Sequence, residues 1–174
     1  MNLYLIGYRG SGKSSVAPLV AKQIGWTAID ADDVVEDESK MSIAEIFSKF
    51  GESEFRRRET QTISELSEQK GYVVSLGGGA PTFQPNRKLI SGSGKTVWLK
   101  ADVDTLWQRI SGDETSDQRR PDLTDQGGRE EVVQLLAKRS PVYAACADYT
   151  IDVDRLSPEE IAERIVNWWK TDDK

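Results

Sequence analysis

The chain has 174 residues, of which 37% are hydrophobic and 30% charged, so one domain with an ordinary core is expected. Its formal net charge of −6 argues against general nucleic-acid binding, and no apolar run is long enough to cross a membrane. Histidine is absent, which excludes a catalytic histidine and a histidine-ligated metal. Cys146 is the only cysteine, which excludes an internal disulfide and fits a reducing compartment. The first residues enter an apolar run without a basic segment, so we expect no signal peptide and a cytoplasmic location.

The first functional pattern in chain order is the segment 7–14, Gly-Tyr-Arg-Gly-Ser-Gly-Lys-Ser, which fits G-x-x-x-x-G-K-[ST]. Residues 2–6 before it are typical of a buried strand, and residues 15–24 after it have one apolar face, as a helix requires. In this context the backbone N–H groups and the helix N-terminus bind phosphate oxygens. Lys13 then reaches the β- and γ-phosphates of a nucleotide, and Ser14 ligates Mg²⁺. Pro18, early in the helix, is expected to bend it.

Further strands and helices alternate along the chain. Strands are predicted at residues 26–29, 72–76, 97–99 and 149–153. Helices are predicted at 42–50, 52–69, 85–90, 102–110, 129–147 with an interruption near Pro141, and from 158 onward behind a capping box at Ser157 and Glu160. This alternation predicts an α/β fold with a parallel sheet and ligands at the carboxyl ends of its strands.

Two segments between these elements need separate interpretation. Residues 91–96, Ser-Gly-Ser-Gly-Lys-Thr, look like a second phosphate loop, but Leu89 replaces the first glycine and a strand follows, so we interpret them as a turn. Residues 112–126 are polar and rich in arginine, without apolar periodicity, and are predicted to form a mobile or functional loop.

Several charged residues have both a functional and a structural interpretation. Asp30 and Asp32 follow the second strand and suit phosphoryl transfer, but an acidic helix start explains them equally well. Arg56 and Glu59 can pair on one helical face, which would fix the arginine for ligand binding. The glycines at 77–79 permit close ligand approach, although an ordinary turn is a serious alternative. Arginines in the loop 112–126 are either phosphoryl-stabilising groups or surface residues.

Taken together these patterns resemble the shikimate kinase family over essentially the whole chain. The matching segments are 7–14, 30–32, 43–47, 51–59, 75–80, 120–121, 139–143 and 152–158. The resemblance implies a three-layer P-loop kinase fold of the nucleoside-monophosphate-kinase type, with a five-stranded parallel sheet flanked by helices. It also implies a single domain over 1–174, a shikimate-binding segment at about 31–61, and a mobile lid at about 112–126.

The resemblance further implies a role for individual residues. The nucleotide-binding residues are Gly10, Ser11, Gly12, Lys13, Ser14, Ser15, Arg109, Arg120 and Arg155. The Mg²⁺ site comprises Ser14, Asp30 and Ser75, the last two largely through water. The shikimate contacts are Asp32, Phe47, Phe55, Arg56, Gly78, Gly79 and Arg139. Lys13, Asp32 and Arg120 are the catalytic candidates, with Asp32 as the base and Arg120 as the lid arginine. Proline at 121 favours Arg120 over Arg119, and Asp122 stands where an apolar lid residue is expected.

The resulting expectation is a monomeric kinase that moves the γ-phosphoryl group of ATP to the 3-hydroxyl of shikimate. Its partners are ATP and shikimate, with Mg²⁺ as cofactor and no nucleic acid or membrane. One alternative is another small-molecule kinase on the same scaffold, acting on gluconate or a nucleoside monophosphate. A second alternative is a nucleotide-gated binding protein without transfer activity.

Overall fold

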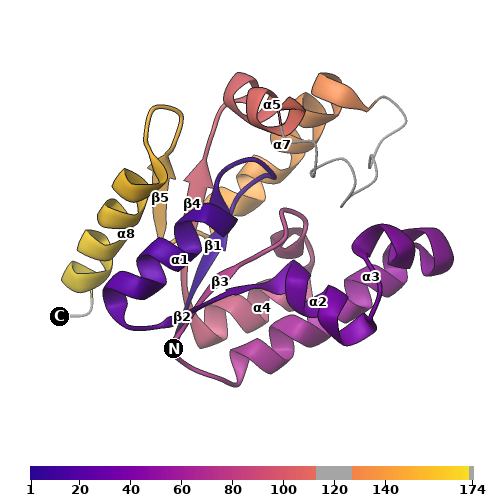
Figure 1. Ribbon diagram of the computed structural model, residues 1–174, viewed down its shortest axis with the longest axis horizontal. Helices are drawn as coiled ribbons and strands as arrows, with labels where there is room; N and C mark the ends of the chain where they lie inside the picture. Colours follow the sequence, from indigo (N-terminus) through magenta and orange to yellow (C-terminus); the bar gives the residue numbers. More distant parts are fainter. Residues whose placement is uncertain (113–126, 173–174) are drawn as a thin grey trace.

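The centre of the molecule is a five-stranded parallel sheet in the order β2-β3-β1-β4-β5 (Figure 1). The computed structural model describes residues 1–112 and 127–172. The strands are β1 Asn2–Ile6, β2 Thr27–Asp30, β3 Tyr72–Ser75, β4 Gly94–Lys100 and β5 Tyr149–Asp152. All five residues of β1 are buried because the strand is central, pairing with β3 on one side and β4 on the other. A central parallel strand covered on both faces has a nearly continuous apolar sequence, here Leu3 to Ile6 after the buried polar Asn2.

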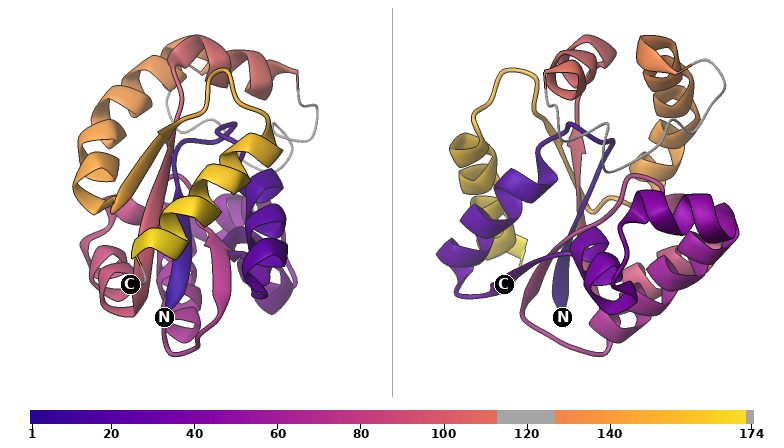
Figure 2. Two further views of the ribbon diagram at one scale, coloured as in Figure 1. Left: turned by 90° about the vertical axis from the view of Figure 1, so that its left-hand side faces the viewer. Right: turned by 45° about the vertical axis from the view of Figure 1, so that its right-hand side comes forward.

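Helices cover both faces of this sheet. They are α1 Lys13–Ile24, α2 Ala31–Ser39, α3 Ile43–Ser67, α4 Gln84–Ser93, α5 Val103–Ser111, α7 Gly128–Cys146 and α8 Pro158–Asp172, with the short 3₁₀ helix η1 at Ala80–Thr82. Helices α1 and α8 lie on one face of the sheet, and α3 and α4 lie on the other (Figure 2). Leu3 and Leu5 belong to the cluster formed with α1 and α8, whereas Tyr4 and Ile6 belong to the cluster formed with α3 and α4. The predicted three-layer α/β fold is confirmed. Among the helices within 1–112 and 127–172, none has the length and apolar content needed to cross a membrane.

The predicted boundary between two helices near residue 51 corresponds to a break inside α3. Gly51 has φ 81° and ψ 173°, a conformation outside the helical region that is essentially restricted to glycine. The break separates a first part, which carries Phe47, from a second part, which carries Phe55 and Arg56. Gly51 therefore sets the angle between two walls of the expected acceptor site.

Replacing Gly51 by alanine is expected to destabilise the fold by about 1–3 kcal/mol, since a Cβ forces this backbone into strain. Apart from the adjacent residues of the helix, no atom in the described part of the chain lies within 4 Å of the place that the Cβ would take. The loss of stability would therefore come from backbone strain and not from a steric clash. Gly92→Ala is the matched control, because Gly92 lies in α4 with equal space around it and without a positive φ. That variant should be neutral or more stable by up to about 1 kcal/mol. Urea unfolding of both variants measures the difference, and equal stabilities would contradict the assignment of strain to Gly51.

Two details of the sequence interpretation are wrong. The helix around Pro141 is continuous as α7, and both Pro141 and Ala137, whose carbonyl loses its helical partner, are exposed to solvent. The segment 91–96 is not a separate turn, because its first three residues end α4 and the last three begin β4.

Candidate active site

The phosphate loop connects the carboxyl end of β1 to the start of α1, the geometry that its sequence predicts. Gly7, Gly10 and Gly12 all have positive φ angles, of 145°, 80° and 95°. Ser11 is fully buried, whereas Ser14 and Ser15 are exposed in the first turn of α1. The loop thus presents the N-terminus of α1, the positive end of its helix dipole, at the carboxyl edge of the sheet, where an anion is favoured.

The Lys13 side chain folds back over this loop. Its Nζ donates to the carbonyl oxygens of Gly7 and Tyr8, both at 2.9 Å, and lies 3.4 Å from Ser11 Oγ. Only 8% of Lys13 is exposed. A buried ammonium held by loop carbonyls stabilises the curled loop and places a positive charge where phosphate binds.

The predicted metal-site residues lie together at the ends of β2 and β3. Ser14 Oγ donates to Asp30 Oδ2 at 2.6 Å, and Asp30 pairs in register with Ser75. A hydroxyl and a carboxylate are the hard oxygen donors that Mg²⁺ prefers. Within the described residues no group of three or more His, Cys, Asp or Glu side chains could hold a metal by itself. These residues therefore fit a Mg²⁺ ion whose other ligands are nucleotide oxygens and water.

Asp30 is also the N-cap of helix α2, as the structural interpretation of this aspartate predicts. Its Oδ1 accepts the backbone N–H of Asp32 at 3.0 Å and caps the helix. Asp32 consequently lies in the first turn of α2, two residues beyond the end of β2, and is partly buried. The cap fixes Asp32 relative to the Ser14–Asp30 pair.

Arg56 lies against the glycine segment that follows β3. Its Nη1 donates to Glu59 Oε2 at 2.9 Å, which confirms the predicted pair, and its Nε and Nη2 lie 3.2 and 3.1 Å from Glu52 Oε1. A Cβ on Gly79 would approach Arg56 Nη2 to 2.5 Å, so the guanidinium rests on bare backbone. Burial raises the pKa of the Glu59 carboxyl, and the charges of Arg56 and Arg139 oppose that shift.

Arg139 reaches the neighbouring glycine from α7. Its Nη1 lies 3.5 Å from the place that a Cβ on Gly78 would take, and its guanidinium lies over the Tyr8 ring at 5.6 Å. Tyr143, one turn further along α7, donates its hydroxyl to the Gly78 carbonyl at 2.5 Å. The two arginines, from distant parts of the chain, thus meet at consecutive glycines beside the phosphate loop. The sequence did not single out the Tyr143 contact, although its spacing from Arg139 places the two on one helical face.

Phe47 and Phe55 also come together, with ring centroids 5.0 Å apart. Phe55 is 2% exposed and packs with Val35, Ile43 and Ile46, whereas Phe47 is partly buried at the margin of that cluster. The break at Gly51 brings the two rings side by side across α3.

On the nucleotide side, Arg109 ties the phosphate loop to the segment after β5. It donates to the carbonyl oxygens of Gly10 and Val153, each at 3.3 Å. Arg155 is exposed two residues beyond Val153. Arg109 therefore lies against the phosphate loop, and Arg155 follows the segment that Arg109 binds. Arg119, Arg120, Asp122 and all of the predicted lid, 112–126, except Gly112 lie outside the described residues.

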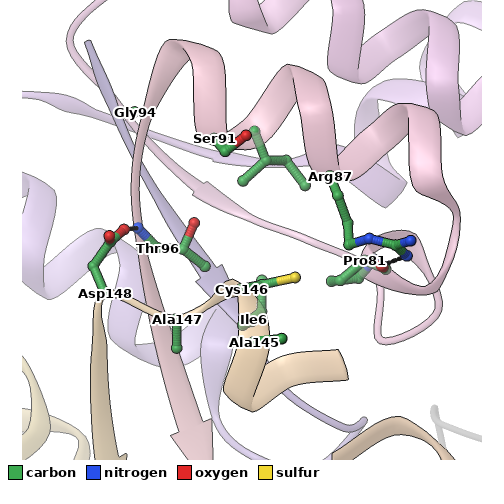
Figure 3. A pocket seen from close by; sticks show the side chains of 11 residues that line it. Ile6, Pro81, Arg87, Ser91, Gly94, Thr96, Ala145, Cys146, Ala147 and Asp148 are labelled. Carbon is green, nitrogen blue, oxygen red and sulfur yellow. Dashed lines mark hydrogen bonds between the residues drawn. The ribbon is translucent and has the colours of Figure 1, made fainter. Parts of the chain in front are cut away.

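A separate cavity of about 300 Å³ lies at the amino ends of β4 and β5, lined among others by Arg87, Thr96 and Cys146 (Figure 3). Burial raises the pKa of the Cys146 thiol, which makes it a poor nucleophile. None of the predicted site residues lines this cavity. The predicted phosphate-loop and metal-site residues lie instead at the opposite, carboxyl edge of the sheet.

A parallel sheet with a lysine-bearing phosphate loop, a carboxylate beside its serine and two arginines that meet at the neighbouring glycines is the arrangement of a P-loop kinase. The sequence model of the shikimate kinase family matches residues 9–170. A shikimate kinase of Rhodopirellula baltica is 42% identical over 165 residues, 95% of this chain and 88% of that protein. One of Thermodesulfovibrio yellowstonii is 40% identical, over 95% of this chain and 92% of that protein. The solved structure of shikimate kinase from Acinetobacter baumannii in complex with shikimate superposes with a TM-score of 0.91 at 33% identity, covering 98% of this chain and 93% of the other. The chain belongs to the shikimate kinase family and is an ATP-dependent kinase.

Proposed function

We propose that this chain transfers the γ-phosphoryl group of ATP to the 3-hydroxyl of shikimate, giving shikimate 3-phosphate and ADP. The observation that carries the proposal is the meeting of Arg56 and Arg139 at Gly79 and Gly78. Two planar guanidinium groups converging beside a phosphate loop suit a small acceptor that carries a carboxylate. Gluconate also carries a carboxylate, but the rings of Phe47 and Phe55 favour a cyclic acceptor.

The proposed acceptor site uses both side chains and backbone. Arg56 and Arg139 bind the carboxylate, and Glu59 holds the Arg56 guanidinium in place. Gly78 and Gly79 donate backbone N–H groups, while Phe47 and Phe55 lie against the ring. Asp32 holds the hydroxyls and accepts the proton of the attacking 3-hydroxyl, so that the oxygen can bond to phosphorus.

The proposed donor site holds ATP on the phosphate loop. Gly10, Ser11, Gly12, Lys13, Ser14 and Ser15 surround the phosphates, and Arg109 and Arg155 flank the adenine. Ser14, Asp30 and Ser75 would hold Mg²⁺, which supplies neutralisation of phosphate charge when bound. Arg120 is proposed to stabilise the transferring phosphoryl group from the lid.

We also propose that residues 1–174 act as one domain, with residues 31–61 binding the acceptor, and that the enzyme is a cytoplasmic monomer. The lone cysteine is compatible with a reducing compartment, and a net charge of −6 does not favour nucleic acid as a partner. Gel filtration with light scattering tests the monomer directly.

An ADP-release assay tests the proposed reaction. Purified enzyme with Mg²⁺ and ATP should release ADP rapidly with shikimate and slowly with gluconate, AMP or no acceptor. Faster release with gluconate or AMP would assign another acceptor. Nucleotide binding without stimulation by any acceptor would favour a binding protein.

Changing Arg139 to lysine keeps the charge but removes the two-point geometry of the guanidinium. We expect shikimate binding to weaken by about 1.5–3 kcal/mol, the range for hydrogen bonds to charged groups. The KM for ATP should change much less. Lys138→Ala, at the adjacent exposed position of α7, is the matched control and should leave both values near those of the wild type.

Comparing the wild type and Arg139→Lys on a second substrate without the carboxylate tests whether Arg139 recognises that group. With shikimate whose carboxylate is reduced to an alcohol, the wild type should be far less active, and the lysine variant should discriminate much less. Equal phosphorylation of both compounds by the wild type would show that the arginines do not recognise a carboxylate.

A further inference from the structure

The phosphate loop contains a second cation, Arg9, which is partly buried and which none of the roles above uses. Arg9 Nη2 lies 3.9 Å from Glu131 Oε1 in the first turn of α7. The Arg9 side chain is 16% exposed and that of Glu131 only 2%. Interactions between charges are stronger at such buried positions than on the surface, because solvent screens them less.

Among the described residues, this ion pair leaves one donor of the guanidinium, Nε, without a partner. The 3.9 Å separation is too long for a hydrogen bond, and Arg9 Nε is buried without a hydrogen-bond partner within the described part of the chain. A buried donor without a partner is unfavourable by about 1–3 kcal/mol. A small movement of the loop toward α7 would bring the donor to a partner and remove that penalty. The Arg9–Glu131 contact can therefore shorten when a ligand orders the loop.

Two further residues of helix α7 approach the same loop, Arg139 directly and Tyr143 through Gly78. The guanidinium of Arg139 lies over the ring of Tyr8. Tyr143 binds the carbonyl of Gly78, and a Cβ on Gly78 would lie 3.2 Å from the carbonyl oxygen of Gly7. The loop thus contacts α7 directly through Tyr8 and Arg9 and indirectly through Gly7, which lies against Gly78. The Arg9–Glu131 pair is the contact nearest the start of that helix.

We propose that Arg9 and Glu131 form a positioning pair that couples acceptor binding to nucleotide binding. A carboxylate bound by Arg139 fixes α7, and Glu131 then fixes Arg9 and with it the shape of the phosphate loop. Because the loop is ordered once for both ligands, the second ligand binds more tightly than the first. The same factor must appear in either order of binding. This inference rests on the proposed function, in which Arg139 binds the acceptor.

The test measures the dissociation constant of ADP by titration calorimetry with Mg²⁺, without shikimate and at saturating shikimate. In the wild type we expect shikimate to tighten ADP binding by at least about fivefold, the lower end of ordinary coupling between sites. Arg9→Gln, Glu131→Gln and the double variant should each reduce that factor to below about twofold, with no further loss in the double variant. Their affinity for ADP alone should stay near the wild-type value.

Arg9→Lys keeps a cation opposite Glu131, and since the contact is an ion pair rather than a hydrogen bond, this variant should retain the coupling. The control is Asp104→Asn, which removes the exposed Arg129–Asp104 pair of 2.7 Å at the same end of α7 and should also retain it. The proposal is overturned by a wild-type factor near one, by coupling that survives in Arg9→Gln or Glu131→Gln, or by its loss in Arg9→Lys. Absence of shikimate phosphorylation by the wild type would instead reject the proposed function, so the two failures are distinguishable.

Discussion

Alanine in place of Lys13 is expected to lower turnover by at least about 100-fold, the scale for losing one preorganised charge-stabilising group. In the proposed role, its ammonium stabilises the negative charge on the phosphoryl group during transfer. The structure adds a second consequence, because Lys13 Nζ also binds the carbonyls of Gly7 and Tyr8. The variant should therefore lose order in the loop as well as catalytic charge. Single-turnover kinetics measure the first effect, and hydrogen exchange of the loop amides measures the second.

The chain supplies a matched control in Lys95, the lysine of the similar segment 91–96. Lys95 lies in β4, with its Nζ 5.8 Å from the ring centroid of Trp168. Lys95→Ala should lose at most about 1 kcal/mol of stability and keep wild-type turnover. Near-normal turnover in Lys13→Ala, or an equal loss in Lys95→Ala, would contradict the assignment of the phosphate loop.

Asparagine in place of Asp32 is expected to lower transfer by roughly 10²–10⁴-fold, the usual contribution of a general base, while ADP binding persists. Asparagine fills the same space but cannot accept the proton of the attacking hydroxyl. Asp33→Asn is the control, because Asp33 occupies the next position of the same helix turn and is exposed. Measuring kcat and KM for both variants distinguishes the loss of a catalytic base at Asp32 from the loss of the adjacent carboxylate at Asp33. If Asp32→Asn stays within a few-fold of the wild type, Asp32 only positions the hydroxyl.

Features that depend on nearby residues could be predicted from the sequence. The phosphate loop, the Arg56–Glu59 pair and the helix boundary at Gly51 each depend on spacings of a few residues, and the structure confirms them. The parallel sheet followed from the alternation of strands and helices, which requires crossover connections.

Contacts between distant segments could not be predicted in the same way. The pairing of Arg9 with Glu131 and that of Tyr143 with Gly78 depend on how α7 lies against the phosphate loop. The uninterrupted course of α7 past Pro141 depends on solvent at its exposed face, which periodicity does not reveal. For Asp30, the sequence left open a choice between metal ligand and helix cap, whereas its carboxylate caps α2 with one oxygen and accepts from Ser14 with the other.

The close packing of Arg56 on Gly79 restricts how this enzyme can escape a competitive inhibitor. Even the smallest side chain at position 79 would lie within 3 Å of the guanidinium carbon and both terminal nitrogens of Arg56. Any such substitution would displace the arginine proposed to hold the natural acceptor, and resistance would carry a loss of fitness. A compound that places a carboxylate between the two arginines, against the bare backbone at 78 and 79, would therefore contact a surface that the enzyme can hardly alter.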